Sequence, residues 1–296
     1  MENEKLTTMK LLAPAKINLF LEVVDKRIDD YHNIRTIFHK IGLFDELTFE
    51  EADEGIELTI EGASLLAGHE NIVYRAAEGF KNYTNIKKGV RIHLKKNIPV
   101  AAGLGGGSSD AASALLGLTR FWGVNISFDE LLMMARDLGA DVPFFLSGPA
   151  ALGLGKGDEL YPLNPIEMQL LIVNPCLALS TASIYKRYDS LKETKMLLTK
   201  YEKDIKIKRF IQGNITVENI GGFLYNDLEA VVIDDYPVIR ELKEALIRQG
   251  AAGSLMSGSG STVFGVFLNE KEAVKGKVVF EKKGYKVWIT KTLTDR

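Results

Sequence analysis

The sequence predicts a mixed fold of strands and helices in two parts, and three observations support this prediction. Apolar, β-rich runs fill the first third of the chain. Helical patterns follow. From about Tyr161 the sequence pattern changes to a short apolar strand and several further helical stretches. The length of 296 residues also suits one large or two ordinary domains. We therefore predict two domains, residues 1–160 and 161–296.

The first domain is expected to hold several short strands and three helices. The predicted strands are Lys10–Leu12 and Ile17–Val24, which Pro14 separates, and then Asp45–Glu51, Gly55–Glu61 and Val90–Leu94. The predicted helices are Asn71–Tyr83 with Asn71 as its cap, Ala111–Phe121, and Ser127–Leu138 with a capping box to Glu130. Pro143 predicts that this last helix does not continue through residues 141–146.

The second domain is expected to alternate helices with three strands. The predicted strands are Gln169–Val173, Val263–Leu268 and Lys286–Thr290. The predicted helices are Thr181–Tyr188, Lys192–Lys208, Tyr225–Ile233, Pro237–Gln249 and Glu270–Lys283. Because residues 192–208 are strongly charged, we expect that helix to be exposed.

Composition excludes several classes of protein. The 37 Lys and Arg residues nearly balance 39 Asp and Glu, so no basic field points to nucleic acid. The single cysteine excludes an internal disulfide and a CxxC motif. No apolar run reaches the length of a membrane span, and residues 1–8 do not resemble a signal peptide. We therefore expect a soluble cytoplasmic protein that binds neither nucleic acid nor a membrane.

The densest glycine run has the composition of a phosphate-binding loop. Glycine allows backbone to approach a ligand closely, and the loop leads into a predicted helix whose first N–H groups attract anions. The Walker, dinucleotide-binding and protein-kinase signatures are all absent here. The candidate ATP-binding residues are Pro99, Val100, Ala101, Ala102, Gly103, Leu104, Gly105, Gly106, Gly107, Ser108 and Ser109.

Three segments in order resemble the three motifs of the GHMP kinases, a family of small-molecule kinases. They are residues 14–18 (PAKIN), 99–110 (PVAAGLGGGSSD) and 253–261 (GSLMSGSGS). The resemblance implies an α/β ATP-binding domain of the ribosomal-protein-S5-like type, followed by a ferredoxin-like α+β domain. Tyr31-His32 and residues 139–145 (GADVPFF) are closest to the branch of the family that acts in the non-mevalonate isoprenoid pathway.

That branch implies a reaction in which ATP phosphorylates the 2-hydroxyl of a cytidine-diphosphate-linked methylerythritol. The resemblance assigns Asp141 as the catalytic base and Lys16 as its electrostatic partner, with Asn18 facing the same substrate. Without the resemblance, the residue types are also consistent with simpler roles. Asp141 could be a turn residue, and Lys16 could be a solvated lysine on a strand.

Further binding residues are implied for the two ligands. Tyr31 and His32 would hold the cytosine with Tyr185 on its other face, and Tyr188 competes for that role. Gly258 and Ser259 would approach the reacting end of the substrate. Asn71 and Lys96 resemble adenine-pocket positions, and Ser108 or Ser109 is a candidate ligand for Mg²⁺ on the ATP phosphates.

Two alternatives remain open. One is a GHMP kinase that acts on another alcohol, such as mevalonate or homoserine. The other is a nucleotide- or RNA-binding module, because the S5-like fold also serves ribosomal proteins. The sequence favours neither a monomer nor a homodimer.

Overall fold

The computed structural model describes residues 8–191 and 198–295, and the chain divides into two compact units. The first contains residues up to Ala15, Leu43–Val100 and Gly105–Leu146; the second contains Lys16–Gly42, Ala101–Leu104 and the chain from Ser147 onward. These units differ from the continuous domains 1–160 and 161–296 because two long strands, β1 (Thr8–Lys26) and β2 (His32–Ala52), run through both of them.

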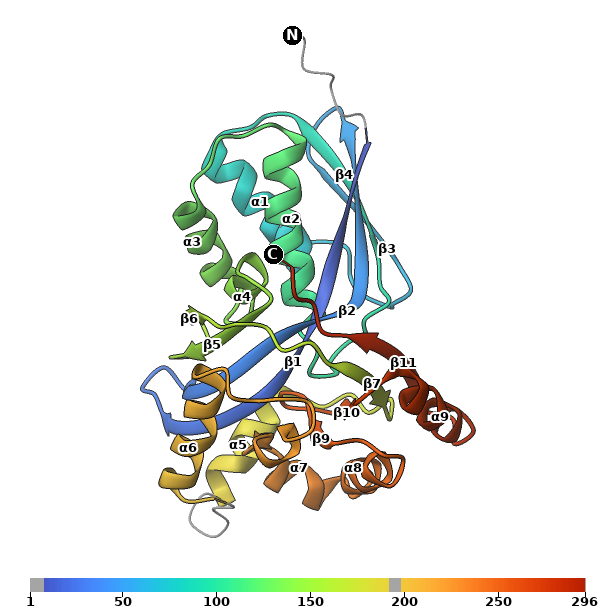
Figure 1. Cartoon of the computed structure of the whole chain (residues 1–296). Coiled ribbons are helices and arrows are strands. Elements are labelled where there is room, and N and C mark those ends of the chain that lie inside the picture. Colours follow the sequence, from blue (N-terminus) through green and yellow to red (C-terminus); the bar gives the residue numbers. More distant parts are fainter. Residues whose placement is uncertain (1–7, 192–197, 296) are drawn as a thin grey trace. The chain divides into compact units, whose positions relative to one another are not determined.

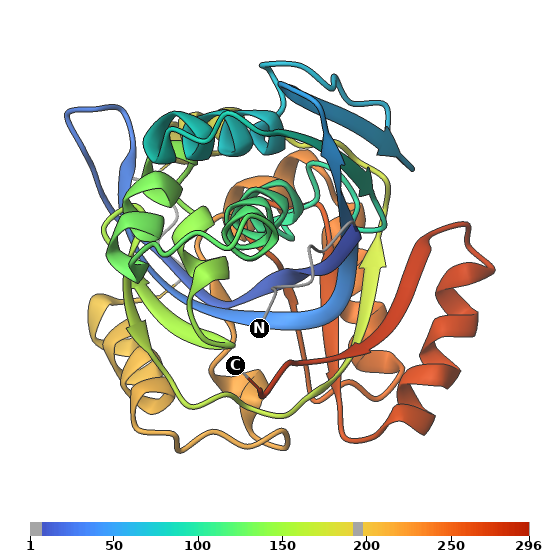
Figure 2. The ribbon, with the colours of Figure 1, turned by 90° about the horizontal axis from the view of Figure 1, so that it is seen from above.

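The first unit packs four helices beside a sheet. The strands β3 (Ile56–Glu61) and β4 (Gly89–Lys95) pair in parallel, and β4 pairs antiparallel with the second part of β2. The helices α1 (Ile72–Thr84), α2 (Gly106–Phe121), α3 (Phe128–Leu138) and α4 (Val142–Leu146) contact one another, and Figure 2 looks along α2. Phe49 of β2 lies against Gly117, so the absence of a side chain on α2 makes room for a buried ring.

The second unit contains two sets of paired strands (Figure 1). The first of them follows the order β8 (Tyr225–Asn226), β1, β2, β5 (Ala150–Leu154) and β6 (Glu159–Pro162). The other is an antiparallel sheet with the order β11 (Lys286–Lys291), β7 (Gln169–Asn174), β10 (Val263–Phe267) and β9 (Gly253–Met256). The helices α8 (Val238–Arg248) and α9 (Glu270–Glu281) pack on this sheet. The remaining elements of the unit are α5 (Thr181–Leu191), α6 (Lys200–Ile211), the 3-10 turn η1 (Ile220–Gly222) and α7 (Glu229–Asp235).

Several sequence predictions of secondary structure are wrong in detail, including the three that follow. β1 continues through Pro14, because the φ angle of proline suits an extended strand and its missing N–H costs one hydrogen bond at most. α2 begins at Gly106, five residues before the predicted start, so the last glycines belong to the helix. Tyr225 and Asn226 form strand β8 beside Phe20 and Leu21 of β1, and the helix begins only at Glu229.

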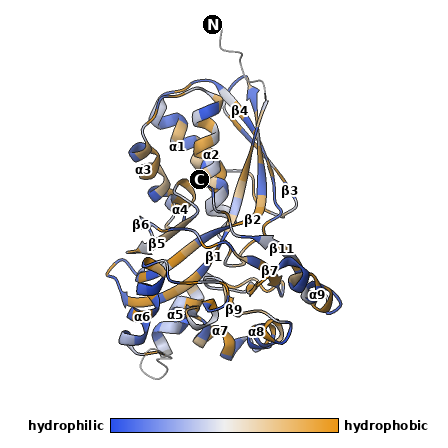
Figure 3. Cartoon of the chain, viewed as in Figure 1, coloured by the Kyte–Doolittle hydropathy of each residue, from blue (hydrophilic) through white to orange (hydrophobic). Residues whose placement is uncertain are grey.

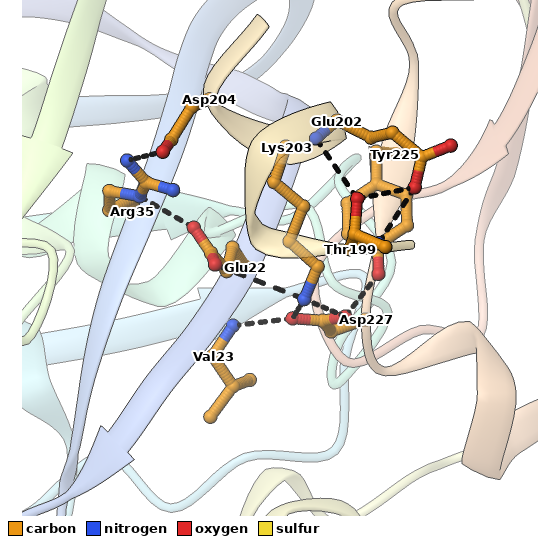
Figure 4. Close-up of polar contacts among 9 residues, drawn as sticks. All are labelled: Glu22, Val23, Arg35, Thr199, Glu202, Lys203, Asp204, Tyr225 and Asp227. Carbon is orange, nitrogen blue, oxygen red and sulfur yellow. Dashed lines mark hydrogen bonds and ion pairs between the residues drawn. The ribbon is translucent and has the colours of Figure 1, made fainter. Parts of the chain in front are cut away.

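The helix α6 is coloured largely hydrophilic in Figure 3, as its charged sequence predicts, but one of its lysines is buried. The Lys203 ammonium lies 2.9 Å from both carboxylate oxygens of Asp227 and 3.9 Å from Glu22 (Figure 4). Glu22 in turn pairs with Arg35, which reaches Asp204 on α6 (Figure 4). This network of opposite charges connects α6 to β1, β2 and β8, whereas residues 192–197 of the predicted helix lie outside the described residues.

None of the helices formed by residues 8–191 and 198–295 has the length and apolar character needed to cross a membrane.

Candidate functional site

In the first unit, the N-terminus of α2 provides an anion-binding geometry. Gly105 precedes the helix with a φ of 69°, and no side chain caps the helix there. The first N–H groups of a helix have no partner within it and carry partial positive charge, so they can bind phosphate oxygens. A left-handed conformation at Gly105 explains why glycine stands at this position.

The next two glycines have different surroundings. A Cβ added at Gly106 would lie 3.0 Å from Ile98 Cγ2 and 3.2 Å from Lys96 Nζ. A Cβ at Gly107 would meet only Ile72 Cγ2, at 3.8 Å. Close internal packing therefore requires Gly106, whereas Gly107 leaves exposed backbone open to a ligand.

The serines of the loop also differ. Ser108 is partly exposed at the first turn of α2. Ser109 is fully buried, and within the described part of the chain its hydroxyl has no hydrogen-bond partner. Ser108 is therefore the more accessible of the two candidate metal ligands. No cluster of three or more His, Cys, Asp or Glu side chains that could hold a metal occurs among residues 8–191 and 198–295.

A buried charge cluster lies under the start of α2. The Lys96 ammonium donates hydrogen bonds to Asp45 and, at 2.6 Å, to Asp110. Asp45 also accepts the N–H groups of Asn97 and Ile98 at 2.5 and 2.8 Å, so both of its carboxylate oxygens are hydrogen-bonded.

Asp110 is the member of this cluster that holds a proton. Burial raises the pKa of Asp110 to about 8, with the Asp45 charge adding to the shift and Lys96 opposing it. Its Oδ1 atom has no partner among the described residues, so one oxygen of a charged Asp110 would be buried without a hydrogen bond. The raised pKa of Asp110 reduces the negative charge beside the helix N-terminus at neutral pH.

The other residues predicted for the nucleotide have structural contacts of their own. Asn71 caps α1 by accepting the Val73 N–H at 2.9 Å, and its amide donates to the carbonyl of Leu66. Asp141 directly precedes α4, a short helix in which Pro143 occupies the first turn. Asp141 is only partly buried, so its carboxylate retains access to solvent.

In the second unit, Lys16 and Asn18 lie together on β1. The Lys16 ammonium donates to Asn18 Oδ1 at 2.6 Å and sits 5.3 Å from the centre of the Phe38 ring. The Asn18 amide donates to Thr36 Oγ1 at 2.7 Å, which fixes its orientation. Both side chains are buried, so Lys16 is not the solvated strand lysine that its residue type alone suggests.

Two loops from distant parts of the sequence meet at this point of β1. The Lys16 N–H donates to the carbonyl of Leu104 at 2.9 Å. The Ser257 hydroxyl donates to the carbonyl of Gly103 at 2.8 Å and accepts the Asn18 N–H at 3.4 Å. Segments from all three motifs are therefore in contact within this unit.

Gly258 completes this arrangement. Its φ is 56°, and an added Cβ would lie 3.3 Å from Asn18 Oδ1 and 3.4 Å from Lys16 Nζ. The next residue, Ser259, shares a hydrogen bond of 2.8 Å with Thr181 at the start of α5. The loop backbone thus lies directly beside the buried ammonium, where a side chain would interfere.

The predicted base-binding residues also come together in the second unit. The rings of His32 and Tyr185 stack with centres 4.8 Å apart, and Tyr31 remains 57% exposed. The Lys156 ammonium lies 4.9 Å from the centre of the Tyr31 ring. Tyr188 is instead part of the apolar core, where burial raises the pKa of its hydroxyl, so Tyr185 is the better placed of the two.

The sequence reasoning missed residues that orient the predicted ones. Asp189 bonds His32 Nε2 at 2.7 Å, and its pKa stays below the usual value because the bonds to His32 and Lys26 outweigh its desolvation. Asp45 and Thr36 were missed in the same way. Short polar side chains on strands and helices carry no motif, so only the fold reveals these partners.

Family models match both halves of the chain. The model for the GHMP kinases N terminal domain matches residues 71–149, and that for the GHMP kinases C terminal matches residues 215–286. A relative from Syntrophus aciditrophicus (strain SB), a 4-diphosphocytidyl-2-C-methyl-D-erythritol kinase, is 43% identical over 93% of this chain and 96% of its own length. The chain belongs to the GHMP kinase family.

Solved structures agree with the fold of this GHMP kinase. A crystal structure of a 4-(cytidine 5'-diphospho)-2C-methyl-D-erythritol kinase is 33% identical and has a TM-score of 0.80, covering 96% of this kinase and 99% of that chain. The homoserine kinase from Cytophaga hutchinsonii has a TM-score of 0.77 over 100% of this kinase and 97% of that chain. At 18% identity this second match supports the fold alone. The predicted GHMP fold class is confirmed, and ATP is the phosphoryl donor expected of a kinase.

We predict that Asp110→Asn removes a pH dependence of stability in this kinase. Because the pKa of Asp110 is raised on folding, its contribution to stability is complete below about pH 4 and is lost as the pH rises towards 8. The free energy of unfolding of the wild type should therefore fall relative to that of the variant by up to about 1.4 kcal/mol per pH unit over this range.

Urea unfolding at several pH values measures this difference. The exposed Asp137, on α3, provides the control Asp137→Asn, which should keep the pH trend of the wild type because Asp110 is unchanged. A difference between the wild type and Asp110→Asn that is flat, or that rises with pH, would show that Asp110 is charged in the folded protein.

Proposed function

We propose that this kinase transfers the γ-phosphoryl group of ATP to the 2-hydroxyl of 4-diphosphocytidyl-2-C-methyl-D-erythritol, in isoprenoid biosynthesis. The observation that carries the proposal is the 43% identity, over nearly the whole chain, to a relative of that name. The placement of Lys16, Asn18 and Gly258 in one cluster supports it, as does the stacked pair of His32 and Tyr185.

Phosphoryl transfer needs positioning and charge stabilisation more than covalent chemistry from the protein. In the proposed mechanism, Asp141 accepts the proton of the attacking hydroxyl. Lys16 stabilises negative charge on the reacting oxygens, and its burial makes that charge more effective than it would be in water. Asn18 holds the ammonium in place through the bond of 2.6 Å.

The ATP phosphates are proposed to bind the backbone of the glycine loop and the N-terminus of α2. Gly105 and Gly107 fit this role, because one adopts a left-handed conformation and the other leaves open backbone. Ser108 would be the protein ligand of Mg²⁺, which would neutralise negative charge on the ATP phosphates. Asn71 and Lys96 are proposed to line the adenine pocket in addition to making their structural contacts.

The cytosine is proposed to bind beside the stacked pair of His32 and Tyr185. The exposed Tyr31 ring offers a further face for stacking, and the nearby Lys156 adds a positive charge. The hydrogen bond between His32 Nε2 and Asp189 fixes the imidazole for recognition of the base.

Assay of the purified protein with a panel of alcohols tests the proposal. ADP formation should require the cytidylated methylerythritol and should not occur with mevalonate or homoserine. Mass spectrometry of the product should show one added phosphoryl group. Turnover of mevalonate or homoserine in its place would assign the protein to the alternative branch of the family.

We predict that Asp141→Asn lowers turnover by about 10²–10⁴-fold, because an amide cannot accept the proton. The two side chains are nearly the same size, so the fold should be retained. Steady-state kinetics gives the result, and Asp137→Asn on the neighbouring helix α3 is the matched control with unchanged turnover. Wild-type turnover in Asp141→Asn would exclude the residue as the base.

We predict that Tyr185→Ala weakens binding of the cytidylated substrate by about 1–3 kcal/mol, the scale of one aromatic–base contact. ATP binding should not change. Tyr185→Phe keeps the ring and serves as the control, with substrate affinity within about twofold of the wild type. Calorimetric titration of each ligand separates the effects; equal losses for both ligands, or none for either, would contradict this role.

A further inference from the structure

The stretch from the end of β8 to the start of α7 contains three buried polar side chains that the proposed mechanism does not use. They are Asn226, Asp227 and Glu229, which are 1%, 4% and 6% exposed. Burying an amide or a carboxylate costs free energy unless its hydrogen bonds are satisfied. Their contacts therefore show what this segment does for the fold.

All the polar groups of the Asn226 side chain are engaged. Its Nδ2 donates to the carbonyls of Met256 and Gly258, each at 2.8 Å. Its Oδ1 accepts the Leu228 N–H at 3.0 Å. A flipped amide would face two carbonyl oxygens with its own oxygen, so these contacts fix the side chain in one orientation.

Glu229 holds the same loop at a neighbouring atom. Its Oε1 accepts the Met256 N–H at 2.8 Å, and its Oε2 pairs with the Lys243 ammonium at 2.5 Å. Burial raises the pKa of Glu229, which the Lys243 charge and these bonds oppose. Two side chains from one short segment thus hold the backbone on both sides of Ser257.

The backbone held in this way is the part of the loop next to Lys16. A Cβ added at Gly258 would lie within contact distance of Lys16 Nζ and Asn18 Oδ1. The C=O and N–H of a trans peptide point in opposite directions. The bond from Asn226 to the Gly258 carbonyl therefore directs the N–H of Ser259 away from Asn226 and fixes the plane of this peptide.

Asp227 has a different role although it is the next residue. It accepts the Val23 N–H at 2.8 Å and pairs with Lys203, and the Tyr225 hydroxyl also donates to it (Figure 4). None of these contacts reaches the loop at 256–258. Asn226 and Asp227 are adjacent and similarly buried, but only Asn226 contacts the loop. Variants of the two residues therefore distinguish an effect on the loop from an effect on general stability.

We propose that Asn226 is a positioning residue for phosphoryl transfer, assisted by Glu229, and that it holds the Gly258–Ser259 peptide in its reactive geometry beside Lys16. The inference rests on the proposed function of the site. A displacement of about 1 Å in a reacting group can lower turnover by about 10²-fold without weakening ground-state binding. Loss of Asn226 should therefore lower kcat more than it changes KM.

The test compares Asn226→Asp with Asp227→Asn. Asn226→Asp places a carboxylate oxygen against two carbonyls, and it should lower kcat by about 10–100-fold with the KM for ATP within about threefold. Asp227→Asn should shift the midpoint of urea unfolding while the folded protein keeps kcat within about threefold. Asn226→Ser, which removes both carbonyl bonds without adding charge, carries the same expectation if Asn226→Asp does not fold.

Wild-type kcat in Asn226→Ser, or equal losses of kcat in the variants of 226 and 227, would overturn the proposal. The wild type is first assayed against the panel of alcohols, and the variants are then compared on whichever alcohol it phosphorylates. A wrong substrate assignment thus appears in the wild type alone, whereas a wrong role for Asn226 appears only in the comparison.

Discussion

The site in the second unit depends on one close approach of backbone to backbone. Gly103 has a φ of 75°, and any side chain on it would overlap the carbonyl of Ser257. This approach allows the Ser257 hydroxyl to bond the Gly103 carbonyl, while the next residue, Leu104, bonds the N–H of Lys16. A short hydrogen-bonded contact, possible only with glycine, thus brings three distant segments of the chain together.

Each unit contains a buried lysine whose charge is balanced by buried carboxylates rather than by solvent. Lys96 is matched by Asp45 and by a largely protonated Asp110, so the start of α2 keeps its positive field. Lys203 is matched by Asp227, which also accepts the N–H of Val23 further along β1. Breaking either cluster would leave a buried charge without a partner, which typically costs about 3–5 kcal/mol.

Local signals in the sequence were enough to predict most of the elements and the motifs of the site. The Asn71 and Ser127 caps and the alternation at residues 56–61 mark elements that the structure contains. Predictions failed where tertiary contacts override local preference. Tyr225 and Asn226 lie in an apolar, helix-like run, yet they pair with β1, and the Asn226 amide bonds the carbonyl of Met256, 30 residues away in sequence. The sequence predicted an exposed Lys203 because charged helices are usually exposed. Its partner Asp227 lies 24 residues away, so no local pattern indicates the buried pair.

Amide hydrogen exchange measured by NMR on Gly103→Ala tests the central contact most directly. The Lys16 and Thr262 N–H groups donate to the carbonyls of Leu104 and Ala102, so both should exchange at least about tenfold faster in the variant. The Val23 N–H, which Asp227 holds, should keep its rate. Gly213→Ala, at a left-handed glycine with open space around it, is the control and should change neither. Unchanged protection of Lys16 and Thr262 in Gly103→Ala would contradict the account.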